Sequence, residues 1–240
     1  MRSSGRGLRD LRPLSFEIAP IRYAEGSAMV MMGETRVLCA VSVEEYVPRW
    51  LRGSDQGWLT AEYALLPRST HTRTSRSHIQ GGRAQEIRRL IGRSLRRAVR
   101  LDLLGERMLT VDCDVIQADG GTRTASINGG YVAVALAVRQ LIKDGLVPEA
   151  TLRPPVGAVS VGIVEDDLVM DLSYEEDASA EMDMNVVMDA GGRFIEIQGT
   201  AEGQPVPRDN VDRLLDLASE GIRSVIQAQR EALACSGIKV

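Results

Sequence analysis

The chain has 240 residues, of which 44% are hydrophobic and 26% charged, and its formal net charge is −4. This composition is sufficient for one substantial core, and it excludes a disordered chain. Three dispersed cysteines favour a reducing compartment over a disulfide framework or a zinc cluster. We find no signal-peptide core at the N-terminus and no uninterrupted apolar run of membrane-spanning length, so we expect a soluble, cytoplasmic protein without a membrane partner.

Charge is divided unevenly along the chain. Residues 1–110 contain 19 Arg, no Lys and 11 acidic residues, whereas residues 111–240 contain 10 basic and 22 acidic residues. The net charges of these halves are therefore +8 and −12. A compositional preference for Arg over Lys explains the choice of cation but not this division of sign. The asymmetry predicts a basic half that contacts a polyanion and an acidic half that holds cations.

Apolar periodicity in the first half predicts three strands before any helix. They lie at residues 27–32, 35–43 and 58–65, and Gly33 and Glu34 are predicted to form a hairpin turn between the first two. Residues 1–15 are rich in Arg and are expected to be extended. Residues 67–82 show no periodicity and end in a glycine pair, which is typical of a long functional loop.

A helix with a basic face is predicted over residues 83–100. At about 100° per residue, its arginines fall on one half-turn and its large apolar residues on the other. Charged helical faces are usually solvated and mix the two signs, but this one has only Glu86 among its arginines. It is therefore predicted to form, with the preceding loop, an electrostatic track for nucleic acid. The candidate RNA-binding residues are Arg68, Arg73, Arg76, Arg93, Arg96 and Arg97.

A candidate anion site lies between a strand at residues 109–116 and an apolar helix from about residue 126 to 143. The connection contains Gly120, Gly121, Thr122 and Arg123. Glycines allow close backbone approach, a helix N-terminus favours an anion, and a guanidinium suits phosphate. The alternative is a simple turn in which hydroxyl side chains cap the helix. Capping, however, does not require an arginine in the turn, so we favour the anion site.

The second half is predicted to contain mainly strands around a buried helix. The helix at 126–143 is apolar on almost every face and is expected to be central. Strands are predicted at residues 154–164, 168–174, 182–188 and 194–199, and a final amphipathic helix is expected to be capped by Asp209. The mixture of hairpins and crossovers implies an α+β sandwich with mixed sheets rather than a doubly wound sheet.

A strongly acidic segment lies between two of these strands. Asp177 and Asp183 flank five residues, and a short reversal there would bring the two carboxylates together. Hard oxygen ligands of this kind suit Mg²⁺ or Mn²⁺. The alternative is a solvated hairpin whose carboxylates simply face water.

Several segments resemble the bacterial ribonuclease PH family, and the resemblance extends from Arg6 to the terminal helix. They are residues 57–63 (GWLTAEY), 66–73 (LPRSTHTR), 81–83 (GGR), 112–127 (DCDVIQADGGTRTASI), 182–188 (MDMNVVM) and 198–203 (QGTAEG). The resemblance implies one domain over residues 1–240, a β-α-β-α sandwich of the ribonuclease PH type with buried central helices. Its basic half would be residues 1–110, and its phosphate and metal half residues 111–240.

The resemblance also implies a phosphorolytic 3′→5′ exoribonuclease. Such an enzyme trims the 3′ ends of tRNA precursors, transfers the terminal nucleotide to inorganic phosphate and releases nucleoside diphosphates, reversibly. Phosphate would be held by Arg83, Gly121, Thr122 and Arg123, and the catalytic, metal-binding carboxylates would be Asp177 and Asp183. A homo-hexamer built as a trimer of dimers is expected. The alternative is a non-catalytic RNA-binding subunit of an exosome-like ring.

Overall fold

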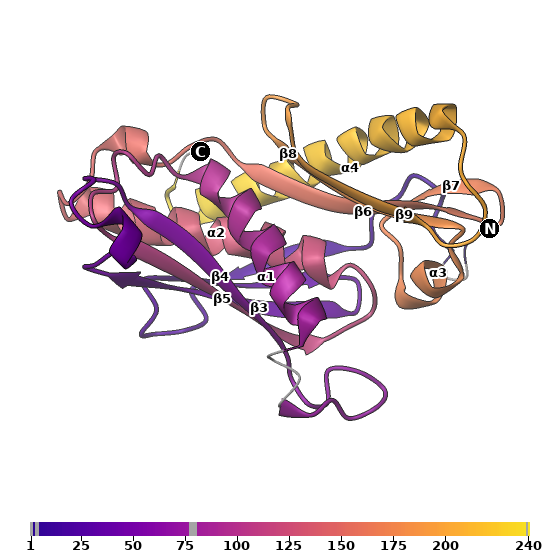
Figure 1. Cartoon of the computed structure of the whole chain (residues 1–240), viewed down its shortest axis with the longest axis horizontal. Coiled ribbons are helices and arrows are strands. Elements are labelled where there is room, and N and C mark those ends of the chain that lie inside the picture. Colours follow the sequence, from indigo (N-terminus) through magenta and orange to yellow (C-terminus); the bar gives the residue numbers. More distant parts are fainter. Residues whose placement is uncertain (1, 3–4, 77–80, 239) are drawn as a thin grey trace.

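Two β-sheets and the helices packed on them make up the protein (Figure 1). The structure is a computed structural model that describes residues 2, 5–76, 81–238 and 240. The five-stranded first sheet has the order β1-β2-β3-β5-β4, and the four-stranded second sheet has the order β7-β6-β8-β9. The strands of the first sheet are β1 (Leu14–Ile18), β2 (Gly26–Met32), β3 (Thr35–Glu44), β4 (Trp58–Leu65) and β5 (Met108–Gln117). Those of the second are β6 (Val156–Val164), β7 (Asp167–Met170), β8 (Met182–Asp189) and β9 (Phe194–Ala201).

Neighbouring strands are antiparallel with one exception. β4 and β5 are parallel, and the chain crosses between them through α1 (Gly82–Leu95) and a short 3₁₀ turn at Arg96–Ala98. β2 and β3 form the predicted hairpin, in which Gly33 has a φ of 57°. Such a left-handed conformation favours glycine. The other helices are α2 (Thr122–Lys143), α3 (Tyr174–Ser179) and α4 (Arg208–Cys235).

The helix α2 is the buried centre of the fold. It packs on β2 and β3 of the first sheet and on β6 of the second. Asn128, fully buried, ties it to the second sheet, because its side chain donates to Ala158 O (2.9 Å) and accepts from Ala158 N (2.8 Å). By length and composition α2 could cross a membrane, but 78% of its apolar window is buried inside the protein, as in a core helix.

The core is divided by the second sheet into two apolar clusters. The larger cluster joins the first sheet, α1 and α2 with one face of β6 and β8, including Val156, Ala158 and Val187. The smaller cluster lies between the opposite face of these strands and α4. The order of layers is thus sheet, helices, sheet, helix, which confirms the expected α+β, β-α-β-α sandwich with mixed sheets and buried central helices.

The main differences from the sequence prediction lie at element boundaries and in short elements. The helix predicted over residues 83–100 ends at Leu95, and Val99 instead makes a β-bridge to Leu152. The strand predicted over 168–174 ends at Met170, and the one-turn helix α3 follows it. The final helix begins at Arg208 after Pro207, so Asp209 is not its cap. β1 lies partly in the segment that was expected to be merely extended.

The close packing of β2 on α2 requires a glycine at position 26. A Cβ at Gly26 would lie 2.1 Å from Ala133 O and 2.6 Å from Ala137 N, both of them backbone atoms. We expect Gly26→Ala to lower the free energy of unfolding by about 1–3 kcal/mol, since the strand must move away from the helix. Denaturant unfolding measures this loss. Gly203→Ala is the matched control because a Cβ there meets no atom within 4 Å; equal stability of both variants would contradict the packing argument.

Candidate active site

A polar cleft of about 550 Å³ brings together the phosphate and metal residues suggested by the sequence. Its walls are the start of α1, the turn between β5 and α2, the helix α3 and the strands β8 and β9. Six candidate residues line it, namely Arg83, Gly121, Thr122, Arg123, Asp177 and Asp183. Residues far apart in the sequence therefore share one site.

The turn before α2 is built for backbone approach. Gly120 and Gly121 have φ values of 70° and 63°, a conformation that other residues adopt at a cost. The helix begins at Thr122 rather than at residue 126, so Thr122 and Arg123 belong to its first turn. No side chain caps this end among the described residues. The simple capping alternative is therefore wrong for this turn.

The hydroxyl groups near the start of α2 bind protein atoms and do not cap the N–H groups of the helix end. Thr124 Oγ1 donates to Gly121 O (2.9 Å), and Ser126 Oγ donates to Thr122 O (2.8 Å). Thr122 Oγ1 lies 2.9 Å from the hydroxyl of Tyr63 on β4, and burial raises the pKa of that phenol. The helix N-terminus thus keeps its positive end for a ligand in the cleft.

Arg123 is held in place by a carboxylate and keeps a free donor. Its Nη2 donates to Glu86 Oε2 (2.8 Å), and Glu86 Oε1 accepts from Gln198 Nε2 (3.0 Å). Burial alone would raise the pKa of Glu86, but the hydrogen bonds from Gln198 and Arg123 outweigh it and the pKa is lowered. The Nε atom of Arg123 is buried and has no hydrogen-bond partner among the described residues. A buried donor without a partner is costly, and an anion in the cleft would satisfy it.

The two carboxylates enter the cleft from different elements. Asp177 lies on α3, whose start is fixed by a capping box between Ser173 and Glu176. Asp183 lies on β8, on the face opposite the α4 cluster. Burial raises the pKa of Asp177 and the charge of Asp183 raises it further, while Arg123 and Arg83 act in the opposite direction. The solvated hairpin alternative does not describe this pair, because the carboxylates line a shared cleft.

These carboxylates fit a hard dication that takes its remaining ligands from water and substrate. Two close acidic groups that raise each other's energy are stabilised by a cation between them. In the described part of the chain, no group of three or more His, Cys, Asp or Glu side chains forms a closed metal site. An open site with two protein ligands is the type that Mg²⁺ and Mn²⁺ use with phosphate substrates.

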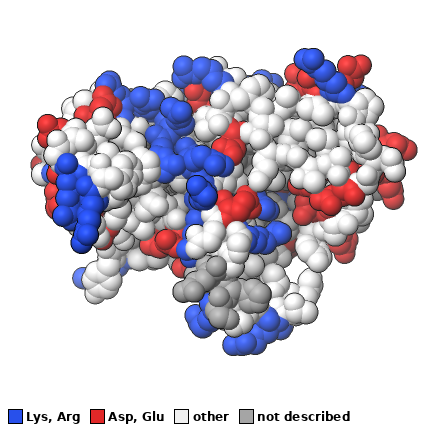
Figure 2. Space-filling view, in the orientation of Figure 1, with Lys and Arg blue, Asp and Glu red and all other residues white. Residues whose placement is uncertain are grey.

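The loop arginines are exposed beside the cleft. Arg68, Arg73 and Arg76 are all solvent-exposed, and Thr70 in the same loop lines the cleft. Residues 77–80 of the predicted 67–82 loop lie outside the described residues. In Figure 2, Lys and Arg side chains gather over the region of α1 and around the lower loop.

The arginines of α1 and its end are less free than the sequence suggests. Arg93 pairs with Glu196 on β9 (2.5 Å) and Arg88 with Glu62 on β4 (2.8 Å). Arg96 stacks on the ring of Trp58 at 4.5 Å and donates to Leu59 O. Arg97 is exposed and has no ion-pair partner among the described residues. Opposite charges and an aromatic ring from other strands therefore engage several arginines of the predicted track, and their binding to RNA stays a prediction.

Sequence reasoning missed three residues that the structure places at the site. Glu86 orients Arg123, Gln198 orients Glu86, and Tyr63 contacts Thr122. Glu86 stands three positions after Arg83 on α1, which places the two on neighbouring positions of one helical face. That spacing was the one signal available in the sequence, whereas the contacts of Gln198 and Tyr63 depend on the tertiary fold.

Family comparisons assign both halves of the chain. The 3′ exoribonuclease family, domain 1, matches residues 10–140, and domain 2 of the same family matches residues 154–221. The two segments correspond to the first sheet with most of α2 and to the second sheet with half of α4. A ribonuclease PH from Moorella thermoacetica is 53% identical over 236 residues, which cover 97% of this chain and 94% of that protein.

Solved structures with the same fold have lower sequence identity. Rice Rrp46 has a TM-score of 0.80 at 19% identity, covering 97% of this chain and 100% of its own. An archaeal exosome core chain has a TM-score of 0.78 at 22% identity, covering 95% and 90%. These structures support the fold. The family membership is shown by the two matches to the 3′ exoribonuclease family and by the relative with 53% identity. The chain therefore belongs to the 3′ exoribonuclease family and, within it, to the ribonuclease PH type of phosphorolytic 3′→5′ exoribonuclease.

Proposed function

We propose that this enzyme trims the 3′ ends of tRNA precursors by transferring the terminal nucleotide to orthophosphate bound beside Arg123. The products are a shortened RNA and a nucleoside diphosphate, and the reverse reaction adds nucleotides. The observation that carries the proposal is the cleft, in which an uncapped helix end and two arginines lie opposite a pair of carboxylates. One wall suits an anion and the other suits a cation.

The phosphate nucleophile needs positioning rather than activation by a base. It is ionised at neutral pH, so the difficulty is to bring it close to the anionic RNA backbone. Arg123 Nε, the guanidinium of Arg83 and the N–H groups at Gly121 and Thr122 would neutralise its charge and direct one oxygen toward the last phosphodiester. A bond forms between that oxygen and phosphorus, and the bond to the 3′ oxygen of the preceding nucleotide breaks. That oxygen leaves with the bonding pair and takes up a proton.

Asp177 and Asp183 are the proposed ligands of Mg²⁺ or Mn²⁺. When bound, a dication would supply charge stabilisation at the scissile phosphate and the departing oxygen. The carboxylates themselves hold negative charge at the wall opposite Arg123, and their mutual repulsion makes cation binding favourable. This role is supported by their shared cleft and by the raised pKa of Asp177.

RNA contact is proposed for the exposed arginines around the cleft. The loop residues Arg68, Arg73 and Arg76, with Arg97, are exposed and make no ion pair with another described residue, so they can contact the phosphate backbone without breaking one. Arg93 and Arg96 contribute only after rearrangement of their present contacts. An Archaeoglobus fulgidus exosome chain of similar fold, with a TM-score of 0.77 and 22% identity, has RNA bound to its active site. That fold-level likeness supports RNA as the ligand of this cleft.

A homo-hexameric ring in the cytoplasm is the proposed state. β9 is an edge strand of the second sheet, and its side chains Phe194 and Ile197 are about half exposed at 49% and 48%. Exposed apolar residues on an edge strand favour a protein partner. The alternative, a non-catalytic subunit of an exosome-like ring, does not require the intact set of arginines and carboxylates that lines this cleft.

Product analysis tests the function directly. We expect a tRNA with a 3′ extension, incubated with the protein, Mg²⁺ and orthophosphate, to yield nucleoside diphosphates, since phosphate replaces water as the nucleophile. Chromatography of the released nucleotides is the measurement. Equal shortening in phosphate-free buffer with release of nucleoside monophosphates would show hydrolysis and refute the proposal.

Loss of the Arg123 side chain separates phosphate use from RNA binding. We expect Arg123→Ala to lower kcat/KM for phosphate by about 10²–10³-fold, because charge stabilisation at the cleft is lost. RNA affinity in a filter-binding assay should stay nearly unchanged. Arg193→Ala is the matched control, since its side chain is 83% exposed and, among the described residues, forms an ion pair with Asp189 alone. A parallel loss of phosphate use and RNA affinity would contradict the assignment.

The titration of Asp177 reports the electrostatics of the cleft. In metal-free protein we expect its pKa above the usual value of about 3.9, so the carboxyl loses its proton at a higher pH than an ordinary Asp. Asp183→Asn should lower this pKa, because a like charge is removed, and Arg123→Gln should raise it, because an opposite charge is removed. NMR chemical shifts of the Asp177 carboxyl group, recorded as a function of pH, measure both changes in pKa. Asp189 lies on β8, the strand of Asp183, but outside the cleft, so Asp189→Asn should leave the pKa of Asp177 unchanged.

A further inference from the structure

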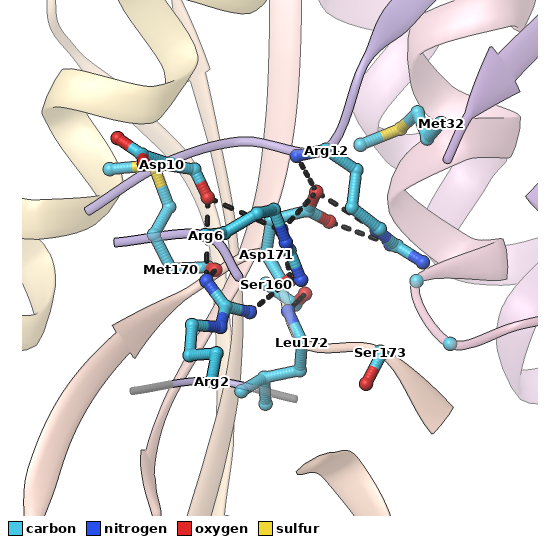
Figure 3. A network of polar contacts seen from close by, with 12 residues as sticks. Arg2, Arg6, Asp10, Arg12, Met32, Ser160, Met170, Asp171, Leu172 and Ser173 are labelled. Carbon is cyan, nitrogen blue, oxygen red and sulfur yellow. Dashed lines mark hydrogen bonds and ion pairs between the residues drawn. The ribbon is translucent and has the colours of Figure 1, made fainter. Parts of the chain in front are cut away.

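The N-terminal segment contacts two elements of the active-site cleft, the turn between β5 and α2 and the helix α3. Arg2 and residues 5–13 lie along the connection between β7 and α3 (Figure 3). Met170 N donates to Leu8 O (2.8 Å). Arg2, Arg6 and Arg12 of this segment direct their guanidinium groups at Asp171 or at the helix that follows it. None of these residues lines the cleft, so the mechanism above does not use them.

Arg12 joins the anion-binding turn to the strand end that precedes α3. Asp171 is completely buried, and its carboxylate accepts from Arg12 N (2.7 Å), Nε (3.0 Å) and Nη2 (2.7 Å). The remaining nitrogen of the same guanidinium, Nη1, donates to Asp119 O in the turn. Two neighbouring glycines leave room for the Arg12 side chain in this position. A Cβ at Gly33 would lie 2.6 Å from Arg12 Cδ, and one at Gly121 would lie 2.8 Å from Arg12 Nη2.

Arg2 holds the helix that carries Asp177. Its Nε and Nη2 donate to the two oxygens of Glu176 at 2.7 and 2.5 Å, which is a two-pronged pair. Its Nη1 and Nη2 also donate to the backbone oxygens of Met170 (2.7 Å) and Asp171 (2.9 Å). Glu176 is the capping-box residue of α3 and immediately precedes Asp177. The side chain of Arg2 is only 3% exposed, so this contact is part of the interior.

The turn before α2 packs closely against the start of α3. A Cβ at Gly120 would lie 2.6 Å from Leu172 O and 2.8 Å from Tyr174 N. Tyr174 N donates to Asp119 Oδ1 (3.2 Å), so the start of α3 is bonded to the turn directly. Burying several charges gives little net stability, because each must be removed from water. A network with so many directed bonds instead fixes geometry.

We infer that Arg2 and Arg12 are positioning residues for phosphorolysis, which set the separation between the anion-binding turn and the carboxylate of Asp177. The inference rests on the proposed function. Arg12 acts on the turn, through Asp119 O, and Arg2 acts on α3, through Glu176. The two arginines therefore influence different steps: Arg12 influences how phosphate is held, and Arg2 influences how the opposite wall meets the transition state.

Substitution of each arginine separates these effects. Arg12→Lys keeps the charge but cannot make the forked contacts, so we expect a phosphate KM about 10-fold higher and weaker calorimetric binding of inorganic phosphate without RNA. Arg2→Gln should lower kcat by about 10- to 100-fold while the phosphate KM stays within about twofold. Arg9→Gln is the matched control from the same segment, because Arg9 makes an exposed pair with Glu220 on α4, and it should retain the parent kinetics.

The assay temperature is set below the unfolding midpoint of every variant, so that folded enzyme is compared with folded enzyme. If Arg2→Gln does not fold, Arg2→Lys, which keeps the buried charge without the two parallel bonds, answers the same question. Unchanged kcat and phosphate KM in folded Arg2 and Arg12 variants would overturn the inference and leave a purely structural network. Absence of nucleoside diphosphates from the unmodified protein would instead refute the proposed function.

Discussion

The ion pair between Arg12 and Asp171 joins three parts of the chain that are distant in sequence. It connects the N-terminal segment, the end of β7 and the turn before α2. Asp171 has a φ of 55° and no exposed surface, so both its backbone conformation and its charge need support from outside its own strand. Arg12 provides that support with three directed bonds. The same bonds bring a basic wall and an acidic wall to face each other.

Facing walls of opposite charge are what phosphorolysis requires. The nucleophile and the RNA are both anions. A site lined only by basic residues would bind them but would repel the dication that we propose beside them. Here the guanidinium of Arg123 and the end of α2 stand opposite Asp177 and Asp183. Glu86 holds one edge of Arg123 through Nη2.

Local sequence was enough to predict the parts of the site that are made by local structure. The glycine turn, the buried helix α2 and the acidic segment were each predicted from patterns within about one element. The helix α3 was not predicted, because a helix of six residues is too short to give a periodic pattern of apolar residues. The partners of Arg123 and Arg12 could not be predicted either, since Glu86 and Asp171 reach them only through tertiary packing. Arg93 and Arg96 were predicted to bind RNA from their place on one helical face. The sequence does not show that Glu196 and Trp58, which lie on other strands, contact them.

The internal engagement of the α1 arginines affects how RNA binding depends on ionic strength. An arginine that already faces a carboxylate carries few condensed anions, and its transfer to an RNA phosphate leaves that carboxylate exposed. Arg88 and Arg93 are in this position, with Glu62 and Glu196 respectively. The number of cations displaced from the nucleic acid is therefore smaller than a count of basic residues implies. Affinity for RNA would then fall less steeply with rising salt concentration than it does for a protein with an unpaired basic surface.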